Sequence, residues 1–249
     1  MTQDFAGRTA LVTGGTSGIG REVARQLAAR GAHVVISGRD AVRGAAAVEE
    51  IRAAGGTADF VRAELDDLAS VRSLAKEAIA VGGGHVDVLV NNAGVFPFGA
   101  TAEVADGVFD STFAVNVRAP FYLVAELAPA MAERGHGSIV NVTTMVATFG
   151  MAGMALYGST KAALGLLTKS WAAEYGPSGV RVNAVSPGPT RTEGTEAMGD
   201  SLGELATQGP LNRVGTVAEV AAGVVFLASD AAAMIHGTSL PIDGGRLAV

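Results

Sequence analysis

The sequence predicts an α/β protein in which one parallel sheet is enclosed by helices, as a single domain over residues 1–249. Short β-branched runs alternate with longer Ala- and Leu-rich segments along the whole chain, which is typical of repeated βαβ units. We find no linker, repeat or low-complexity boundary that would divide the chain. Hydrophobic residues make up 49% of the sequence and cysteine is absent, so we expect a full-sized core without disulfides.

The elements follow one another in a regular order. The strand candidates are Ala10 to Thr13, His33 to Ser37, Ala58 to Arg62, Val86 to Asn91, Gly137 to Thr143, Arg181 to Ser186 and Ser239 to Ile242. Between the first two, Ile19, Val23 and Leu27 repeat at helical spacing, and Gly31 follows where a C-terminal cap is wanted.

Two further helices have recognisable N-terminal caps. Asp40 is an N-cap candidate for the helix after the second strand. Thr216 with Glu219 forms a capping box that opens the last long helix.

Two segments depart from this pattern. Residues 190–215 contain five glycines with weak periodicity and predict a loop with a short helix, of the kind that serves as a substrate lid. Residues 159–171 are apolar around more than one helical face, so we expect a second subunit to cover one face.

The charge balance favours a small-molecule partner. With 18 basic and 24 acidic residues the net charge is −6, which excludes the electrostatic footprint of a nucleic-acid or anionic-membrane binder. Asp4 and Arg8 interrupt the N-terminus before any apolar run, so we expect no signal peptide and a cytoplasmic protein. Residues 137–160 are uncharged, but their hydroxyl, amide and glycine residues favour buried globular structure over a membrane span.

A glycine-rich turn follows the first strand candidate and reads Thr13-Gly14-Gly15-Thr16-Ser17-Gly18-Ile19-Gly20. Its glycines let the chain turn tightly and bring backbone N–H groups and a helix N-terminus against a pyrophosphate. An ordinary strand-to-helix turn is the alternative, but the strand before and the helix after favour a dinucleotide site. The expected contacts are Gly14, Thr16, Ser17, Gly18, Ile19 and Gly20.

The second strand candidate ends in Ser37-Gly38-Arg39, where a carboxylate would favour the 2′-hydroxyl of NAD(H). Arginine instead offers a planar fork of donors to a 2′-phosphate, so NADP(H) is favoured and NAD(H) remains possible. Alternatively, Arg39 is a solvated residue or pairs with Asp40.

Tyr157 and Lys161 stand four residues apart, which places them on one face of a helix, about one turn or ~6 Å apart along its axis. A cation near a phenol favours phenolate and lowers its pKa, as a general acid/base near neutral pH requires. A Tyr/Lys pair at this spacing is usually structural, so a catalytic role for it depends on the other motifs of the sequence.

Six motifs together resemble the short-chain dehydrogenase/reductase family over essentially the whole chain. They are Thr13-Gly14…Gly18-Ile19-Gly20, Asn91-Asn92-Ala93-Gly94, Asn116, Tyr157…Lys161, Pro187-Gly188…Thr192 and Asp243-Gly244-Gly245. The resemblance implies a Rossmann-like, doubly wound, seven-stranded parallel sheet with helices on both faces. It also implies a nicotinamide cofactor, interconversion of an alcohol and a carbonyl, and a tetramer.

The resemblance assigns catalytic roles. Tyr157 would exchange a proton with the substrate oxygen. Lys161 would hold the nicotinamide ribose and, together with the positive charge of the oxidised cofactor, depress the tyrosine pKa. Asn116 would support a water that replenishes the proton, although a core hydrogen bond at a helix bend would also explain it.

The resemblance also extends the cofactor site. Asn91, Ala93 and Gly94 would line the cleft, with glycine at position 94 because a side chain would collide with adenosine. The nicotinamide end would meet Pro187, Gly188, Thr190 and Thr192. Asp243 belongs to a turn that is expected to be structural.

The sequence departs from the family pattern at two places. Thr144 stands where the family usually has a substrate-orienting serine; it keeps the hydroxyl but adds a methyl group. Thr143 would point to the opposite strand face. Glu64-Leu65 replaces an aspartate that commonly meets adenine, and we retain both residues as cofactor contacts.

Other functions are disfavoured. The four histidines are scattered and no Gly-x-Ser-x-Gly elbow occurs, which argues against a hydrolase, and no ligand spacing suggests a metal. A catalytically quiet NADP(H)-binding scaffold on the same fold is the remaining alternative, but such a protein would be expected to lose Tyr157 or Lys161. The expected substrate is an uncharged ketone, imine or secondary alcohol. Its expected lining is Phe96, Phe98, Thr148, Phe149, Gly150, Met151, Met154 and the loop after Thr190.

Overall fold

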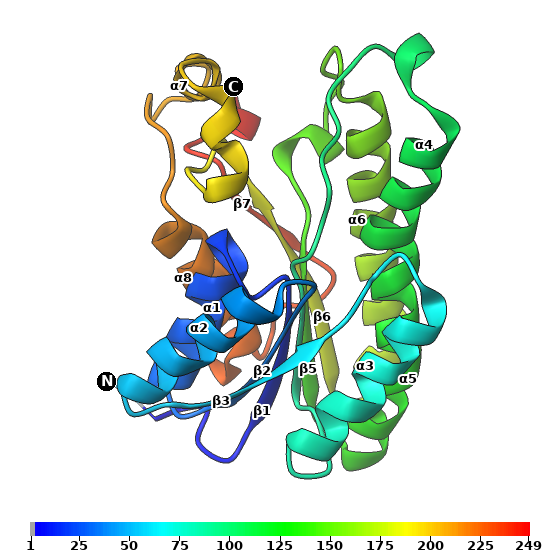
Figure 1. Cartoon of the computed structure of the whole chain (residues 1–249), viewed down its shortest axis with the longest axis vertical. Helices are drawn as coiled ribbons and strands as arrows, with labels where there is room; N and C mark the ends of the chain where they lie inside the picture. The colour runs from blue at the N-terminus through cyan, green and yellow to red at the C-terminus, as the bar shows by residue number, and fades with distance from the viewer. Residues whose placement is uncertain (1–2) are drawn as a thin grey trace.

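The computed structural model describes residues 3–249 and contains a seven-stranded sheet in which every neighbouring pair is parallel (Figure 1). The order is β3-β2-β1-β4-β5-β6-β7. The strands are β1 (Thr9–Thr13), β2 (His33–Gly38), β3 (Thr57–Arg62), β4 (Val88–Asn91), β5 (Gly137–Val142), β6 (Val180–Pro187) and β7 (Ser239–Ile242). All seven predicted strands are confirmed, with ends that differ by at most two residues.

Helices cover both faces of the sheet, and each layer has its own apolar core (Figure 1). One layer holds α1 (Gly18–Ala29), α2 (Ala41–Ala53) and α8 (Val217–Ala228). The other holds α3 (Leu68–Val81), α4 (Asp106–Phe113), α5 (Ala119–Arg134) and α6 (Ala155–Tyr175). This arrangement confirms the doubly wound α/β fold.

Local sequence explains where these helices begin and end. Asp40 accepts hydrogen bonds from Val42 and Arg43 at the start of α2, as predicted for an N-cap. Thr216 and Glu219 form the predicted capping box of α8. Gly31 follows α1 with φ +94° and donates to the carbonyl of Ala28, which confirms its capping role.

Residues 190–215 contain two short helices, η5 (Glu193–Met198) and α7 (Ser201–Ala206), so this segment holds more helix than the sequence predicts. Backbone hydrogen bonds between Arg191 and Gly215 and between Leu211 and Gly244 anchor its two ends. We call residues 190–215 the flap. In Figure 1 its α7 lies beside the C-terminus, at the end of the molecule where α6 begins.

Within the described residues, none of the helices combines the length and the apolar character needed to span a bilayer. The uncharged stretch 137–160 forms β5, a short turn and the start of α6.

Candidate active site

The glycine-rich turn between β1 and α1 is built from positions that exclude side chains. Gly14 and Gly18 have φ of +63° and +52°, a region that L-residues rarely adopt. A Cβ on Gly20 would lie 2.4 Å from both the Gly14 carbonyl oxygen and Asn92 Nδ2. The turn therefore packs tightly against Asn92, the residue that follows β4 (Val88–Asn91).

Asn92 holds this turn in place. Its Nδ2 donates to the carbonyls of Thr13 at 2.9 Å and Gly14 at 3.2 Å, and Thr13 Oγ1 accepts from the amides of Asn92 and Ala93. Sequence reasoning did not assign Asn92 a role. Its position beside Asn91 could have indicated this role, because successive side chains along an extended chain point to opposite faces of the sheet.

The start of α1 has neither a side-chain cap nor an acidic residue of its own. Ser17 is the N-cap residue, yet its side chain makes no capping hydrogen bond, and the first turn of α1 holds no acidic residue. Thr16 lies under Gly38, where a Cβ would come within 2.7 Å of its methyl group. Gly38 is therefore required by Thr16, in addition to any room it leaves for a ribose phosphate. Ile19 packs on the core beneath α1.

Arg39 is exposed at the carboxyl end of β2. The predicted alternative partner, Asp40, bonds Arg43 instead, at 3.0 Å. Within residues 3–249 we find no hydrogen bond or ion pair of the Arg39 side chain, whereas Arg62 donates to its backbone carbonyl. Glu64 is paired with Arg62 at 3.1 Å, and Leu65 packs on the core.

Tyr157 lies in the first turn of α6, and its phenol hydrogen-bonds the side chain of Thr144. Thr144 is the second residue after the end of β5. Its neighbour Thr143 donates a hydrogen bond of 2.7 Å to the carbonyl of Val185 on β6. Phe96 packs edge-on to Tyr157 with ring centroids 6.2 Å apart. Tyr157 and Thr144 thus bring two hydroxyl groups together at the carboxyl end of the sheet.

Lys161 lies one turn further along α6, as predicted. It is 3% exposed, and its Nζ donates to the Val142 carbonyl at 2.8 Å. A Cβ on Gly94 would lie 3.1 Å from this Nζ and 3.3 Å from Asn116 Oδ1. A side chain at position 94 would therefore crowd Lys161 and Asn116, and the clash with adenosine expected from the sequence stays a prediction.

The lowering of the tyrosine pKa by Lys161 together with an oxidised cofactor stays a prediction, and in the protein alone burial dominates the pKa of both groups. Burial raises the pKa of Tyr157 to about 12, and the bond to Thr144 offsets only part of that effect. Burial also lowers the pKa of Lys161 to about 8, so the ammonium is itself disfavoured. Desolvation is therefore the largest cause of both pKa shifts.

Asn116 lies in a π-helical turn, η2 (Ala114–Arg118), between α4 and α5. Its side chain is fully buried; Oδ1 accepts from the amide of Val95, and Nδ2 donates to the Val95 carbonyl and to Thr160 Oγ1. Thr160 in turn donates a hydrogen bond of 2.7 Å to the Tyr157 carbonyl, so Asn116 is linked through Thr160 to the backbone of Tyr157. A distorted helix at Asn116 agrees both with support of a water and with a core hydrogen bond at a helix bend. In this structure the side chain makes core hydrogen bonds, to Val95 and Thr160.

Asn91 does not line the cleft with its side chain, contrary to expectation. It is 1% exposed and donates through Nδ2 to Asn141 on β5, which in turn donates to Thr168 on α6. This buried chain joins β4, β5 and α6 beneath the site, because the Asn91 side chain points to the sheet face that α6 covers.

The far end of the site is formed by β6 and the flap. Gly188 follows Pro187 and would bring a Cβ within 2.7 Å of Asp243, so the glycine there is required by the C-terminal turn. Thr190 is buried and donates to the Gly188 carbonyl. Thr192 caps η5 in a box with Thr195 and lies beside Gly18. The flap therefore touches the glycine-rich turn.

This fold and site define an oxidoreductase class, and comparison with known proteins identifies the family. Residues 14–246 match a family described as enoyl-(acyl carrier protein) reductase. The 2,5-dichloro-2,5-cyclohexadiene-1,4-diol dehydrogenase of Sphingobium indicum is 38% identical over 98% of both chains.

Two solved structures are similar throughout. A short-chain dehydrogenase/reductase family protein is 51% identical with a TM-score of 0.92, covering 99% of this chain and 100% of the other. A candidate NAD(P)-dependent gluconate 5-dehydrogenase from Beutenbergia cavernae, with NADP bound at low occupancy, is 38% identical with a TM-score of 0.94 over 100% of both chains. The chain belongs to the short-chain dehydrogenase/reductase family, whose members use NAD(P) to act on CH–OH or C=O groups.

Proposed function

We propose that this protein is an NADP(H)-dependent oxidoreductase that interconverts a carbonyl and a secondary alcohol, with Tyr157 as the general acid/base. The hydrogen-bonded pair of Tyr157 and Thr144 carries the proposal, because it joins two hydroxyl groups where one substrate oxygen can contact both. The glycine-rich turn, with its left-handed glycines and with no side-chain cap at the start of α1, fits a dinucleotide pyrophosphate. When bound, the cofactor supplies or accepts the hydride.

The roles of the side chains follow from their protonation. A phenol with a pKa of about 12 keeps its proton at neutral pH, which suits donation to the oxygen of a carbonyl during reduction. Thr144 orients that oxygen through its own hydroxyl. Alcohol oxidation needs an easier loss of the phenol proton, and a positive charge near Tyr157, from Lys161 or an oxidised nicotinamide, would favour it.

NADP(H) is preferred over NAD(H) in this proposal because Arg39 is exposed and its guanidinium has no partner within the described residues. The bound NADP of the Beutenbergia cavernae structure supports the same choice. Phe96 beside Tyr157 favours an apolar substrate body, and its ring lies near the flap, where a Cβ on Gly194 would be 3.5 Å away. Flap movement would then open and close the substrate space.

The proposed function is tested by assaying a panel of ketones and secondary alcohols with NADPH and NADP⁺. We expect turnover of at least one uncharged ketone or secondary alcohol by the wild-type protein and none by Tyr157→Phe. Tight NADPH binding without turnover of any compound would instead support a catalytically quiet binding protein.

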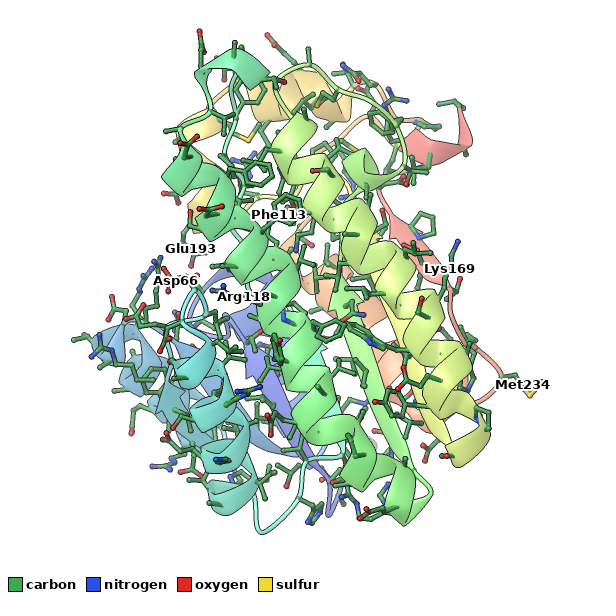
Figure 2. All side chains as sticks on the ribbon, turned by 90° about the vertical axis from the view of Figure 1, so that its right-hand side faces the viewer. Asp66, Phe113, Arg118, Lys169, Glu193 and Met234 are labelled. Carbon is green, nitrogen blue, oxygen red and sulfur yellow. The ribbon has the colours of Figure 1, made fainter. Side chains whose placement is uncertain are left out.

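We also propose a homo-oligomer, a tetramer by family resemblance. On the face that Figure 2 turns toward the viewer, α4 continues into α5 through η2, and α6 lies beside them. Phe121 of α5 and Leu166 of α6 are 44% and 66% exposed, and a second subunit would cover them.

A further inference from the structure

We infer that Glu193 of the flap competes with the cofactor phosphates for the N-terminus of α1, and so sets the affinity of this protein for its dinucleotide. The inference rests on the proposed function, since it takes the glycine-rich turn as a cofactor site. Glu193 is labelled in Figure 2.

The contact joins two segments that are far apart in the chain. Glu193 Oε2 accepts a hydrogen bond of 2.9 Å from the backbone amide of Gly18, the first residue of α1. The flap lies close to Gly18: a Cβ there would be in ordinary van der Waals contact, 3.4 Å from Thr192 and 3.6 Å from this carboxylate oxygen. A negatively charged group of the chain therefore occupies a donor that a bound pyrophosphate would use.

The electrostatics at this helix end favour an anion. Backbone N–H groups of the first turn have no helical partner, and the helix dipole adds positive potential there. α1 supplies no acidic residue in its own first turn, and Ser17 makes no capping bond. Glu193 of the flap thus provides the negative charge that the first turn of α1 lacks.

The flap holds this carboxylate in place through a local turn. Glu193 is the first residue of η5, directly after Thr192, whose hydroxyl accepts from the Thr195 amide while the Thr195 side chain bonds the Thr192 amide. Since Glu193 is exposed and its contact faces solvent, the bond to Gly18 is weak enough for a ligand to displace.

The need to displace Glu193 from Gly18 lowers the apparent affinity of the protein for the cofactor. A ligand that binds only when Glu193 has left Gly18 has its affinity reduced by the fraction of molecules in that open state. A carboxylate at an exposed helix N-terminus typically shifts such an equilibrium by about two- to fivefold. Removing its charge should therefore tighten NADPH binding by about this factor.

The test compares Glu193→Gln with Glu196→Gln by isothermal titration of NADPH. Glu196 lies in the same short helix and is exposed, and within the described residues its side chain has no hydrogen bond or ion pair. Both variants remove one negative charge from the flap, but only the first weakens the contact with Gly18. Thermal melting checks that both variants fold as the wild type does.

We expect Glu193→Gln to bind NADPH about two- to fivefold more tightly than the wild type, and Glu196→Gln to match the wild type. Equal tightening by both variants would overturn the inference, since it would reflect net charge alone. Unchanged or weaker binding by Glu193→Gln would also overturn it. If neither the wild type nor the variants bound NADPH or NADH, the proposed function would fail, and the inference with it.

Discussion

The Lys161 ammonium donates a hydrogen bond of 2.8 Å to the carbonyl of Val142, the last residue of β5. The bond ties α6, which carries Tyr157, to the strand after which Thr144 emerges. It also keeps a titratable group 3% exposed in the interior, where burial lowers its pKa from 10.5 to about 8.

This depressed pKa predicts that stability depends on pH. Between about pH 8 and 10.5 the folded chain has released the Lys161 proton while the unfolded chain keeps it. The unfolded state then binds more protons, so the free energy of unfolding rises with pH, by about 3 kcal/mol in all. Tyr157 acts in the opposite direction above pH 10, because its pKa is about 12 in the folded protein.

Urea denaturation between pH 7.5 and 9.5 measures the effect of Lys161, in a window chosen to avoid the tyrosine. We expect the free energy of unfolding of the wild type to rise with pH relative to that of Lys161→Met. Parallel curves for the two proteins would show that Lys161 does not titrate near pH 8.

Tyr157→Phe should remove turnover and leave cofactor binding nearly unchanged. The substitution deletes the phenol oxygen that exchanges a proton, and general acid/base groups contribute about 10²- to 10⁴-fold to rates. Steady-state kinetics and NADPH titration separate the two effects. Undiminished reduction by this variant would contradict the assignment of Tyr157.

Arg39→Ala should weaken NADPH binding by about tenfold, since a hydrogen bond to a charged group contributes about 1.5–3 kcal/mol and this one is exposed. NADH lacks the 2′-phosphate and is the control within the same variant. The expected result is a large rise in KM for NADPH and a small one for NADH. Similar changes for both cofactors would show that Arg39 does not read the phosphate.

Gly20→Ala should destabilise the protein by about 1–3 kcal/mol, because its Cβ would lie 2.4 Å from Gly14 O and Asn92 Nδ2. The control is Gly165→Ala in α6, where no atom lies within 4 Å of a Cβ. That change should stabilise α6 by about 0.5–1 kcal/mol. Thermal melting distinguishes them, and equal melting temperatures would contradict the packing of Asn92 on the turn.

Light scattering at micromolar concentration tests the oligomer. We expect a mass that is a multiple of 25.0 kDa, and a lower mass for Leu166→Lys, which places a charge on the exposed face of α6. A wild-type mass of 25 kDa would show that this face needs no second subunit.

Local sequence determined much of this protein. The β-branched runs specify the strands, Asp40 and Thr216 specify helix starts, and the four-residue spacing places Tyr157 and Lys161 on one face. These features depend on backbone preferences and helical periodicity, which act between residues close in the chain. The family motifs likewise identify the glycine-rich turn and the oxidoreductase class.

Only the tertiary structure decided what those residues contact. Asn91 points into the buried network and Asn92 onto the glycine-rich turn, because the position of β4 in the sheet sets which face is covered. The pKa values of Tyr157 and Lys161 depend on burial, which spacing along a helix does not reveal. Glu193 reaches Gly18 across 175 residues, since packing of the flap against α1 exists only in the folded chain.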